Sequence, residues 1–293
     1  DKVARDMMRS ELNHLLGNTK PANPVRVKNS VTNTVDNRLR IWRVVLETEP
    51  GIEVPLIMLL PKAVKKVPVV LALAQGGKEG FLKHRAGQIS ILLKYGVAVC
   101  LPDVRGTGET RAGDDRGRRG ADTSRSATAL MVGQPMLVAR LRDARSVLAW
   151  LRLQDEFDAK RIGLWGDSFQ ETFGAVKPEA FKVPRGVART LPQPEPLGGL
   201  LALFTKLYEE DVRTVVTQHG LHSFAPVFTD HQVYLPHDAV VPGLLAVVDL
   251  PGLVKALEPH PLMERGRPIN CFGRLMKDKE YQPALWLLFG LRD

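Results

Sequence analysis

Cysteine is nearly absent from this 293-residue chain, which contains only Cys100 and Cys271. Two cysteines make neither a disulfide framework nor a cysteine-based metal site, so we expect both to be structural. No apolar run approaches the ~18 residues that a membrane-spanning helix needs, and we expect no membrane span. The chain starts at Asp1, with neither an initiator methionine nor a signal peptide, which leaves the compartment open and allows a fragment or a processed form.

Aromatic residues are also few, at 6% of the chain, although the formal net charge is +9. The densest arginine cluster, in residues 111–122, is interleaved with aspartates and glycines and has no aromatic residue on which a base could stack. We interpret it as solvated surface and expect no nucleic-acid partner; a basic-surface nucleic-acid binder is the weaker alternative. The 44% hydrophobic and 25% charged fractions are those of an ordinary globular protein.

The N-terminal part differs in pattern from the rest of the chain. Residues 2–16 space their apolar positions as an amphipathic helix does, and a polar stretch follows to Asn37. From residue 39 the pattern alternates, and two runs separated by Glu49-Pro50-Gly51 predict an antiparallel hairpin over 39–60. We therefore divide the chain into a helix and linker at 1–38 and one domain at 39–293.

The domain then alternates strands and helices, which is typical of a parallel α/β sheet. We expect buried strands at 67–74, 97–103, 161–168 and 212–220, and helices at 84–96, 128–153 (with a bend near Pro135), 197–210 and, as two short pieces, 241–259. The proline-rich residues 174–198 are interpreted as a lid or an extended loop.

The stretch Gly166-Asp167-Ser168-Phe169-Gln170 follows the third of these strands. A nucleophile elbow is usually written G-x-S-x-G, because the turn from strand to helix needs small residues on both sides of the serine. The first glycine is present, and Gln170 stands in place of the second. Ligands bind at the carboxyl ends of parallel strands, so Ser168 lies where a catalytic residue is expected.

Five segments in the expected order make the chain similar to the α/β-hydrolase superfamily, in particular to its acetyl xylan esterase and dienelactone hydrolase-like branch. They are VPVVLALAQGG, YGVAVCLPDVRGTGET, LRDARSVLAWLR, RIGLWGDSF and YLPHDAVVPGLL. The resemblance covers roughly residues 40–262. It implies the α/β-hydrolase fold, a mostly parallel sheet with helices on both faces and an N-terminal antiparallel hairpin.

The resemblance also implies an acyl-transfer site without a metal or other cofactor. Ser168 would attack an ester carbonyl, and the oxyanion would be held by the N–H of Phe169 and an N–H near Gln75. The Asp103 and Arg105 of the turn D-x-R-G-x-G would brace the loops near the site.

The base and the acid of a triad are harder to place. The family's acid position falls near Ile269, with Glu264 too early to match, and residues 271–293 contain no histidine. We therefore expect a truncated C-terminal part and assign His237 as the base. Asp249 is the expected orienting acid, with the adjacent Asp238 as an open alternative.

Three other histidines, His219, His222 and His231, also follow Ser168, and the first two come at the end of a strand. With Asp230 they have a loose ligand-like spacing, but without H-E-x-x-H or a cysteine pair we expect no metal site. The sequence thus predicts a serine esterase for a small-molecule or carbohydrate ester. A catalytically degenerate domain that binds a carbohydrate or a protein is the alternative, and the oligomeric state stays open.

Overall fold

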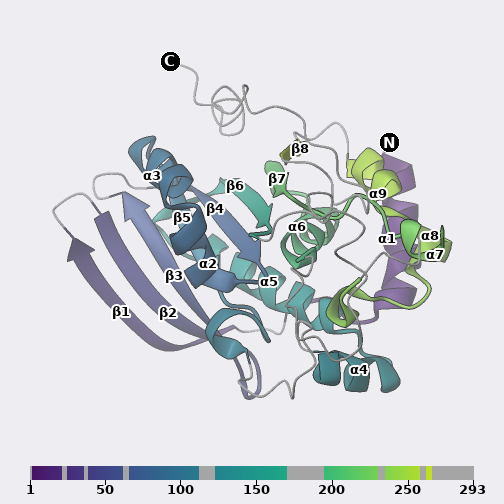
Figure 1. Cartoon of the computed structure of the whole chain (residues 1–293). Helices are drawn as coiled ribbons and strands as arrows, with labels where there is room; N and C mark the ends of the chain where they lie inside the picture. The colour runs from purple at the N-terminus through teal and green to yellow at the C-terminus, as the bar shows by residue number, and fades with distance from the viewer. Residues whose placement is uncertain are drawn as a thin grey trace, which may run out of the picture.

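A mixed β-sheet with helices on both faces forms the frame of the molecule (Figure 1). The computed structural model describes residues 2–21, 25–35, 39–61, 66–111, 123–169, 195–229, 235–257 and 262–265. Its strands are β1 (Arg26–Val35), β2 (Leu39–Glu49), β3 (Ile52–Pro61), β4 (Val67–Ala74), β5 (Ala98–Pro102), β6 (Phe157–Asp167), β7 (Thr214–Gln218) and β8 (Leu262–Arg265).

The strand order is β1-β2-β3-β5-β4-β6-β7-β8. The strands β5, β4, β6, β7 and β8 run parallel to one another, whereas β1, β2 and β3 pair antiparallel. The helices are α1 (Lys2–Leu16), α2 (Gly77–His84), α3 (Ala86–Lys94), α4 (Thr123–Met131), α5 (Met136–Arg152), α6 (Leu197–Tyr208), α7 (Pro226–Thr229), α8 (Leu244–Val247) and α9 (Leu250–Leu257). The predicted hairpin is therefore confirmed as β2 and β3, and the two short helices predicted at 241–259 are α8 and α9.

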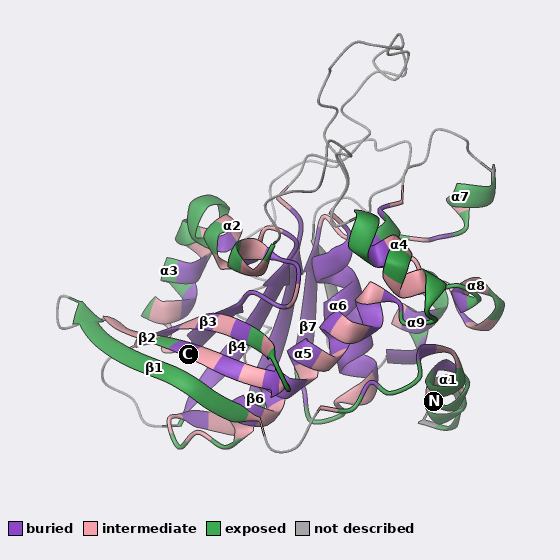
Figure 2. Ribbon diagram, turned by 90° about the horizontal axis from the view of Figure 1, so that it is seen from below, coloured by how far each residue is buried: buried purple, intermediate pink, exposed green. Residues whose placement is uncertain are grey.

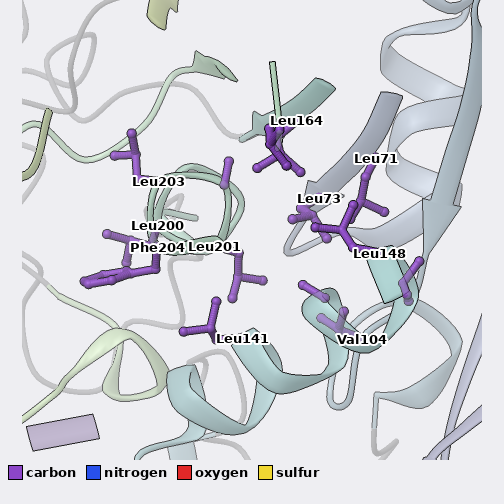
Figure 3. Close-up of a cluster of buried hydrophobic side chains, with 14 of the residues drawn as sticks. Leu71, Leu73, Val104, Leu141, Leu148, Leu164, Leu200, Leu201, Leu203 and Phe204 are labelled. Atoms are coloured by element: carbon purple, nitrogen blue, oxygen red, sulfur yellow. The ribbon is translucent and has the colours of Figure 1, made fainter. Parts of the chain in front are cut away.

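The central strand β4 is buried on both faces, as its unbroken apolar run predicts. Leu71 and Leu73 face the larger core cluster, which contains the apolar faces of α5 and α6 (Figure 3). Val70 and Ala72 face a smaller cluster that contains side chains of α2 and α3. Each fully buried leucine contributes about 2 kcal/mol through removal from water, so these two layers hold the sheet in place.

The first turn of α6 lies directly against the ends of β4 and β6. A Cβ atom on Gly198 would come 2.3 Å from the carbonyl oxygen of Leu73 and 2.4 Å from that of Asp167. A Cβ on Gly166 would come 2.3 Å from the carbonyl oxygen of Gly198. Only glycine at both positions allows this approach of two backbones, and it places α6 immediately beside Ser168.

The N-terminal segment contributes more than the predicted helix and linker. Helix α1 confirms the amphipathic pattern at 2–16, but β1 lies within the stretch expected to be a linker and pairs with β2 along its whole length. All ten residues of β1 are exposed, as Figure 2 shows in green at the edge of the sheet. Because neither face of β1 is covered, its sequence carries no burial pattern from which a strand could be predicted.

Two helix predictions need correction. The helix expected at 128–153 with a bend is two separate helices, because Gly133 has a φ of +71° and Pro135 caps the start of α5. The helix expected at 84–96 is α3, which starts only after Arg85, and α2 precedes it. Helix α2 has the sequence GKEGFLKH, whose two glycines and single fully buried large side chain, Phe81, give no clear helical period.

Within the described ranges, no single helix is long and apolar enough to cross a membrane. The pair His237–Val247 and Leu250–Leu257, which is bent by 72°, passes by length and composition only, which is weak evidence for a span. Leu244, Leu250, Leu253 and Leu257 of this pair are part of the larger core cluster.

The contact between α6 and the sheet can be tested with two glycine-to-alanine substitutions in helices. We expect Gly198→Ala to lower the free energy of unfolding by about 3 kcal/mol or more, because the methyl group meets backbone atoms that cannot move aside. Gly87→Ala in α3, where a Cβ meets no atom within 4 Å, should be neutral or stabilise by up to about 1 kcal/mol. Urea denaturation measures both, and equal effects would contradict the close approach.

Candidate active site

Ser168 is the first residue after β6, at the carboxyl edge of the parallel strands. Its backbone N–H donates to the carbonyl oxygen of Gln218 at 3.1 Å, so the turn is attached to the end of β7. The residue is 1% exposed, and within the described part of the chain its Oγ has no hydrogen-bond partner. A buried hydroxyl without a partner is uncommon, because its desolvation is left uncompensated.

Phe169 connects the turn after β6 with the turn after β4. Its ring lies over Gly76 and Gly80. A Cβ atom would come 3.1 Å from the ring at Gly76 and 2.4 Å from it at Gly80. It also packs edge-to-face on Phe81, with ring centroids 5.1 Å apart. Phe169 therefore packs on Gly76, the residue after Gln75, and the turns after β6 and β4 are in contact.

A buried ion pair binds the side chain of Gln75. Gln75 Nε2 donates to Asp238 Oδ2 at 3.2 Å, and Arg140 Nη1 donates to the same oxygen at 2.5 Å. Both charged residues are at most 1% exposed. Arg140 also donates to the carbonyl oxygens of Arg105 and Gly106, at 2.8 and 3.3 Å. Asp238 is thus bound to the Gln75 side chain and to α5, and its neighbour His237 is brought to the same edge of the sheet.

His237 and Asp249 lie apart from Ser168 in their contacts. The His237 side chain is exposed at the start of the short 3₁₀ helix His237–Ala239. Asp249 accepts hydrogen bonds from the Ser223 hydroxyl and from the backbone N–H groups of Phe224 and Leu250. Burial raises the pKa of Asp249, but these hydrogen bonds outweigh it and leave the pKa below its usual range. Among the residues described, no hydrogen bond joins His237 to Ser168 or to Asp249, so their roles as base and acid stay predictions.

His219 is the histidine that the sheet places beside the serine turn. It follows β7, whose last residue, Gln218, pairs with Asp167 and accepts the Ser168 N–H. Its φ of 54° lies in the left-handed region, which few residues other than glycine adopt. Its Nδ1 is 3.5 Å from Nη2 of Arg85. Backbone strain of this kind is often found at functional sites.

Arg85 forms a forked ion pair with Asp167, the residue before the serine. Its Nε and Nη2 lie 2.8 and 2.9 Å from the two carboxylate oxygens. Burial raises the pKa of Asp167 to about 6, although the ion pair with Arg85 acts in the opposite direction. Nothing in the sequence indicates a role for Arg85, because an isolated arginine between two short helices carries no recognisable spacing.

The turn D-x-R-G-x-G braces its surroundings as predicted. Asp103 accepts hydrogen bonds from the backbone N–H groups of Lys78 and Glu109 and forms an ion pair with Lys78 Nζ at 2.5 Å. Arg105 forms ion pairs with Asp143 of α5 and with Glu49 of β2. These bonds tie the loop after β5 to α2, α5 and the hairpin.

Sequence reasoning also missed Arg140, for which a signal exists. Positions 137, 141, 144 and 148 form the buried apolar face of α5, and Arg140 falls on that same face. A charged residue on an apolar face predicts a buried partner.

No group of three or more His, Cys, Asp or Glu side chains suited to hold a metal ion occurs in the part of the chain that the structure describes. His222 is exposed there, and Asp230 and His231, like Ile269 and Cys271, lie outside the described residues. The proline-rich residues 174–194 also lie outside them, so the predicted lid is not described.

Comparison with known proteins identifies the fold. No family model and no curated protein sequence matches the chain. Among solved structures, a candidate acetyl xylan esterase from Bacteroides fragilis superposes with a TM-score of 0.67 and 16% identity over 89% of this chain and 67% of its own. Acetyl xylan esterase 1 from Thermoanaerobacterium sp. has a TM-score of 0.54 and 13% identity, and the match covers 98% of this chain and 92% of that protein. A glucuronoyl esterase from Solibacter usitatus has a TM-score of 0.53 and 15% identity, over 89% of this chain and 72% of its own.

These neighbours are α/β-hydrolase-fold esterases, and the chain has the α/β-hydrolase fold that its sequence predicts. Sequence identities of 13–16% show that the fold is shared, and they do not show that the reaction is shared.

The raised pKa of Asp167 predicts how stability depends on pH. The pKa of Asp167 is raised from 3.8, the ordinary value, to about 6 in the folded protein. A carboxyl group with a raised pKa stabilises the folded state below pH 4, and this stabilisation is lost as the pH rises to 6. We expect the wild type to lose up to about 3 kcal/mol relative to Asp167→Asn over that interval. Urea denaturation at pH 4, 5 and 6 measures the difference. A difference that moves the other way would mean that Arg85 outweighs burial.

The pair of Arg140 and Asp238 should be sensitive to loss of one partner. Arg140→Met leaves a buried carboxylate without its cation and should cost about 3–5 kcal/mol of unfolding free energy. The double variant Arg140→Met/Asp238→Asn should recover at least half of this loss. Arg161→Met, which removes an exposed ion pair with Asp158, is the control and should cost less than about 1 kcal/mol. Equal losses for the two single variants in urea would contradict the role given to Arg140.

Proposed function

We propose that the protein is a serine hydrolase that cleaves carboxylic esters through an acyl-enzyme on Ser168. The observation that carries the proposal is a buried serine hydroxyl without a partner among the described residues, at the carboxyl end of β6, beside the clustered turns of Phe169 and Gln75. No described residue binds this hydroxyl, so a hydrogen bond from it to a base displaces no described partner.

The reaction would follow the chemistry of acyl transfer. Ser168 Oγ attacks the ester carbonyl and passes its proton to a histidine, and the alcohol leaves with that proton. Backbone N–H groups of Phe169 and of the Gln75 turn would hold the negative oxygen of the tetrahedral intermediate. Loss of one such donor typically raises the barrier by about 3 kcal/mol. Water then repeats the sequence and releases the acid.

Two histidines are candidates for the base. His237 is the assignment from sequence, with Asp249 as the orienting acid, and the bond between Asp238 and Gln75 supports its place near the oxyanion turn. His219 gains support from its position directly after Gln218, which accepts the Ser168 N–H. We retain His237 as the proposed base and include His219 in the test.

The substrate class proposed is an acetylated carbohydrate or a related sugar ester. The support is that the solved structures with this fold arrangement include acetyl xylan esterases and glucuronoyl esterases. The exposed His237 and the neighbouring turn would then line the side from which a sugar approaches.

A fluorophosphonate probe tests the nucleophile directly, because it reacts only with an activated serine. We expect rapid labelling of the wild type, and no labelling of Ser168→Ala. His237→Ala should lose at least roughly a thousandfold in rate, as removal of a triad base does in other enzymes. Ser90→Ala, an exposed serine in α3, is the matched control and should label normally.

The same samples then receive a panel of short acyl esters and acetylated xylo-oligosaccharides. If His219→Ala is not labelled and His237→Ala is, the base is His219 and not His237. A folded wild type that is not labelled would contradict the proposed hydrolase and favour the degenerate, ligand-binding alternative.

A further inference from the structure

Arg85 occupies the junction between α2 and α3. Its backbone leaves the helical region, with φ −127° and ψ 16°, so the residue ends one helix and precedes the next. Its side chain is 14% exposed and reaches the serine turn. A long cationic side chain that is mostly buried needs a defined set of partners.

Those partners are three consecutive residues of the turn. The guanidinium group forms the fork with Asp167 at 2.8 and 2.9 Å. Nη2 also donates to the carbonyl oxygen of Ser168 at 3.4 Å, and the guanidinium carbon lies 5.4 Å from the centre of the Phe169 ring. One side chain therefore contacts the residue before the nucleophile, the nucleophile itself and the residue after it.

The same group also reaches the neighbouring strand. Nη2 of Arg85 is 3.5 Å from Nδ1 of His219, the residue that follows β7. Since Ser168 N–H donates to Gln218 of that strand, the serine turn is attached to the end of β7 twice, once through the backbone and once through Arg85.

The turn needs such an attachment because one of the two glycines of the usual elbow is missing. Gly166 is pressed against the backbone of Gly198, which holds the strand side of the elbow. Gln170 replaces the glycine that normally allows close packing on the other side. A displacement of the nucleophile by ~1 Å can reduce the rate by roughly a hundredfold, so the turn must be held by other contacts.

We infer that Arg85 is a positioning residue for Ser168: its guanidinium fork holds the turn Asp167-Ser168-Phe169 beside the end of β7. The inference rests on the proposed function for its effect on catalysis, but the locking of the turn can be measured without catalysis. Arg85 itself touches no reacting atom.

Arg85→Lys removes the fork but keeps the positive charge. An ammonium group cannot donate the two parallel, coplanar hydrogen bonds that a guanidinium group donates to a carboxylate. The matched control is Arg152→Lys, which breaks a similar fork with Asp211 at the opposite edge of the sheet, before β7 begins. We expect Arg85→Lys to reduce the rate of fluorophosphonate labelling at least tenfold, and kcat in proportion with little change in KM. Arg152→Lys should stay within twofold of the wild type at a comparable loss of stability in urea.

A second measurement reports the turn without hydrolase chemistry. Ser168→Cys is made in a Cys271→Ser background, in which the only other thiol is the buried Cys100, whose pKa is raised by burial. Residue 168 is 1% exposed, so the rate at which its thiol reacts with iodoacetamide reports how readily the site around it opens. Adding Arg85→Lys should raise the alkylation rate at least fivefold, and adding Arg152→Lys should not.

The outcomes separate the two proposals. Wild type that fails to label contradicts the proposed hydrolase, and the alkylation rates then decide the inference alone. Equal alkylation rates for the two lysine variants overturn the inference whatever the labelling shows. If Arg85→Lys does not fold, the double variant Arg85→Gln/Asp167→Asn replaces it. This variant removes both charges and keeps hydrogen-bonding groups, and we expect the same slower labelling and faster alkylation.

Discussion

The close contact of two backbones, Gly198 in α6 with the ends of β4 and β6, is the constraint on which the site depends. It leaves no room for a side chain at Gly166 or Gly198, so α6 packs directly on the backbone of the sheet. The helix then buries Leu200, Leu201 and Phe204 in the core (Figure 3). The end of β6 is held between this helix and the neighbouring strands, so the position of Ser168 follows from packing that lies beneath it.

Above this apolar layer, buried charges connect the loops. The pairs Arg85–Asp167 and Arg140–Asp238, with the contacts around Asp103, each join a loop near the carboxyl ends of the strands to a helix or to another loop. Buried ion pairs add little net stability, since desolvation offsets most of the attraction, but they demand a defined geometry. Their effect here is to fix the relative positions of the turns that carry Ser168, Phe169 and Gln75, which is the condition that preorganised catalysis requires.

Much of the fold and part of the site could be predicted from the sequence. Strands β4, β5 and β6 can be recognised as apolar runs because both of their faces are buried. The parallel topology then places Ser168 and Gln75 at the carboxyl ends of the strands. Strand β1 could not be predicted, because a fully exposed strand leaves no hydrophobic period. Arg85 could not be predicted either, since its partners lie 82 and 134 residues away in the chain.

The sequence by itself determined that the segments of β4, β5, β6 and β7 are strands of a parallel sheet, although not that β8 joins them, and which serine follows β6. Burial imposes patterns on neighbouring residues, and these patterns can be recognised in the sequence. Only the tertiary structure decided that Phe169 packs over Gly76, that Asp238 is bound by Arg140 and Gln75, and that His219 lies beside the serine turn. Such contacts join residues far apart in the chain, and their geometry depends on how helices and strands pack, which no local pattern of residues records.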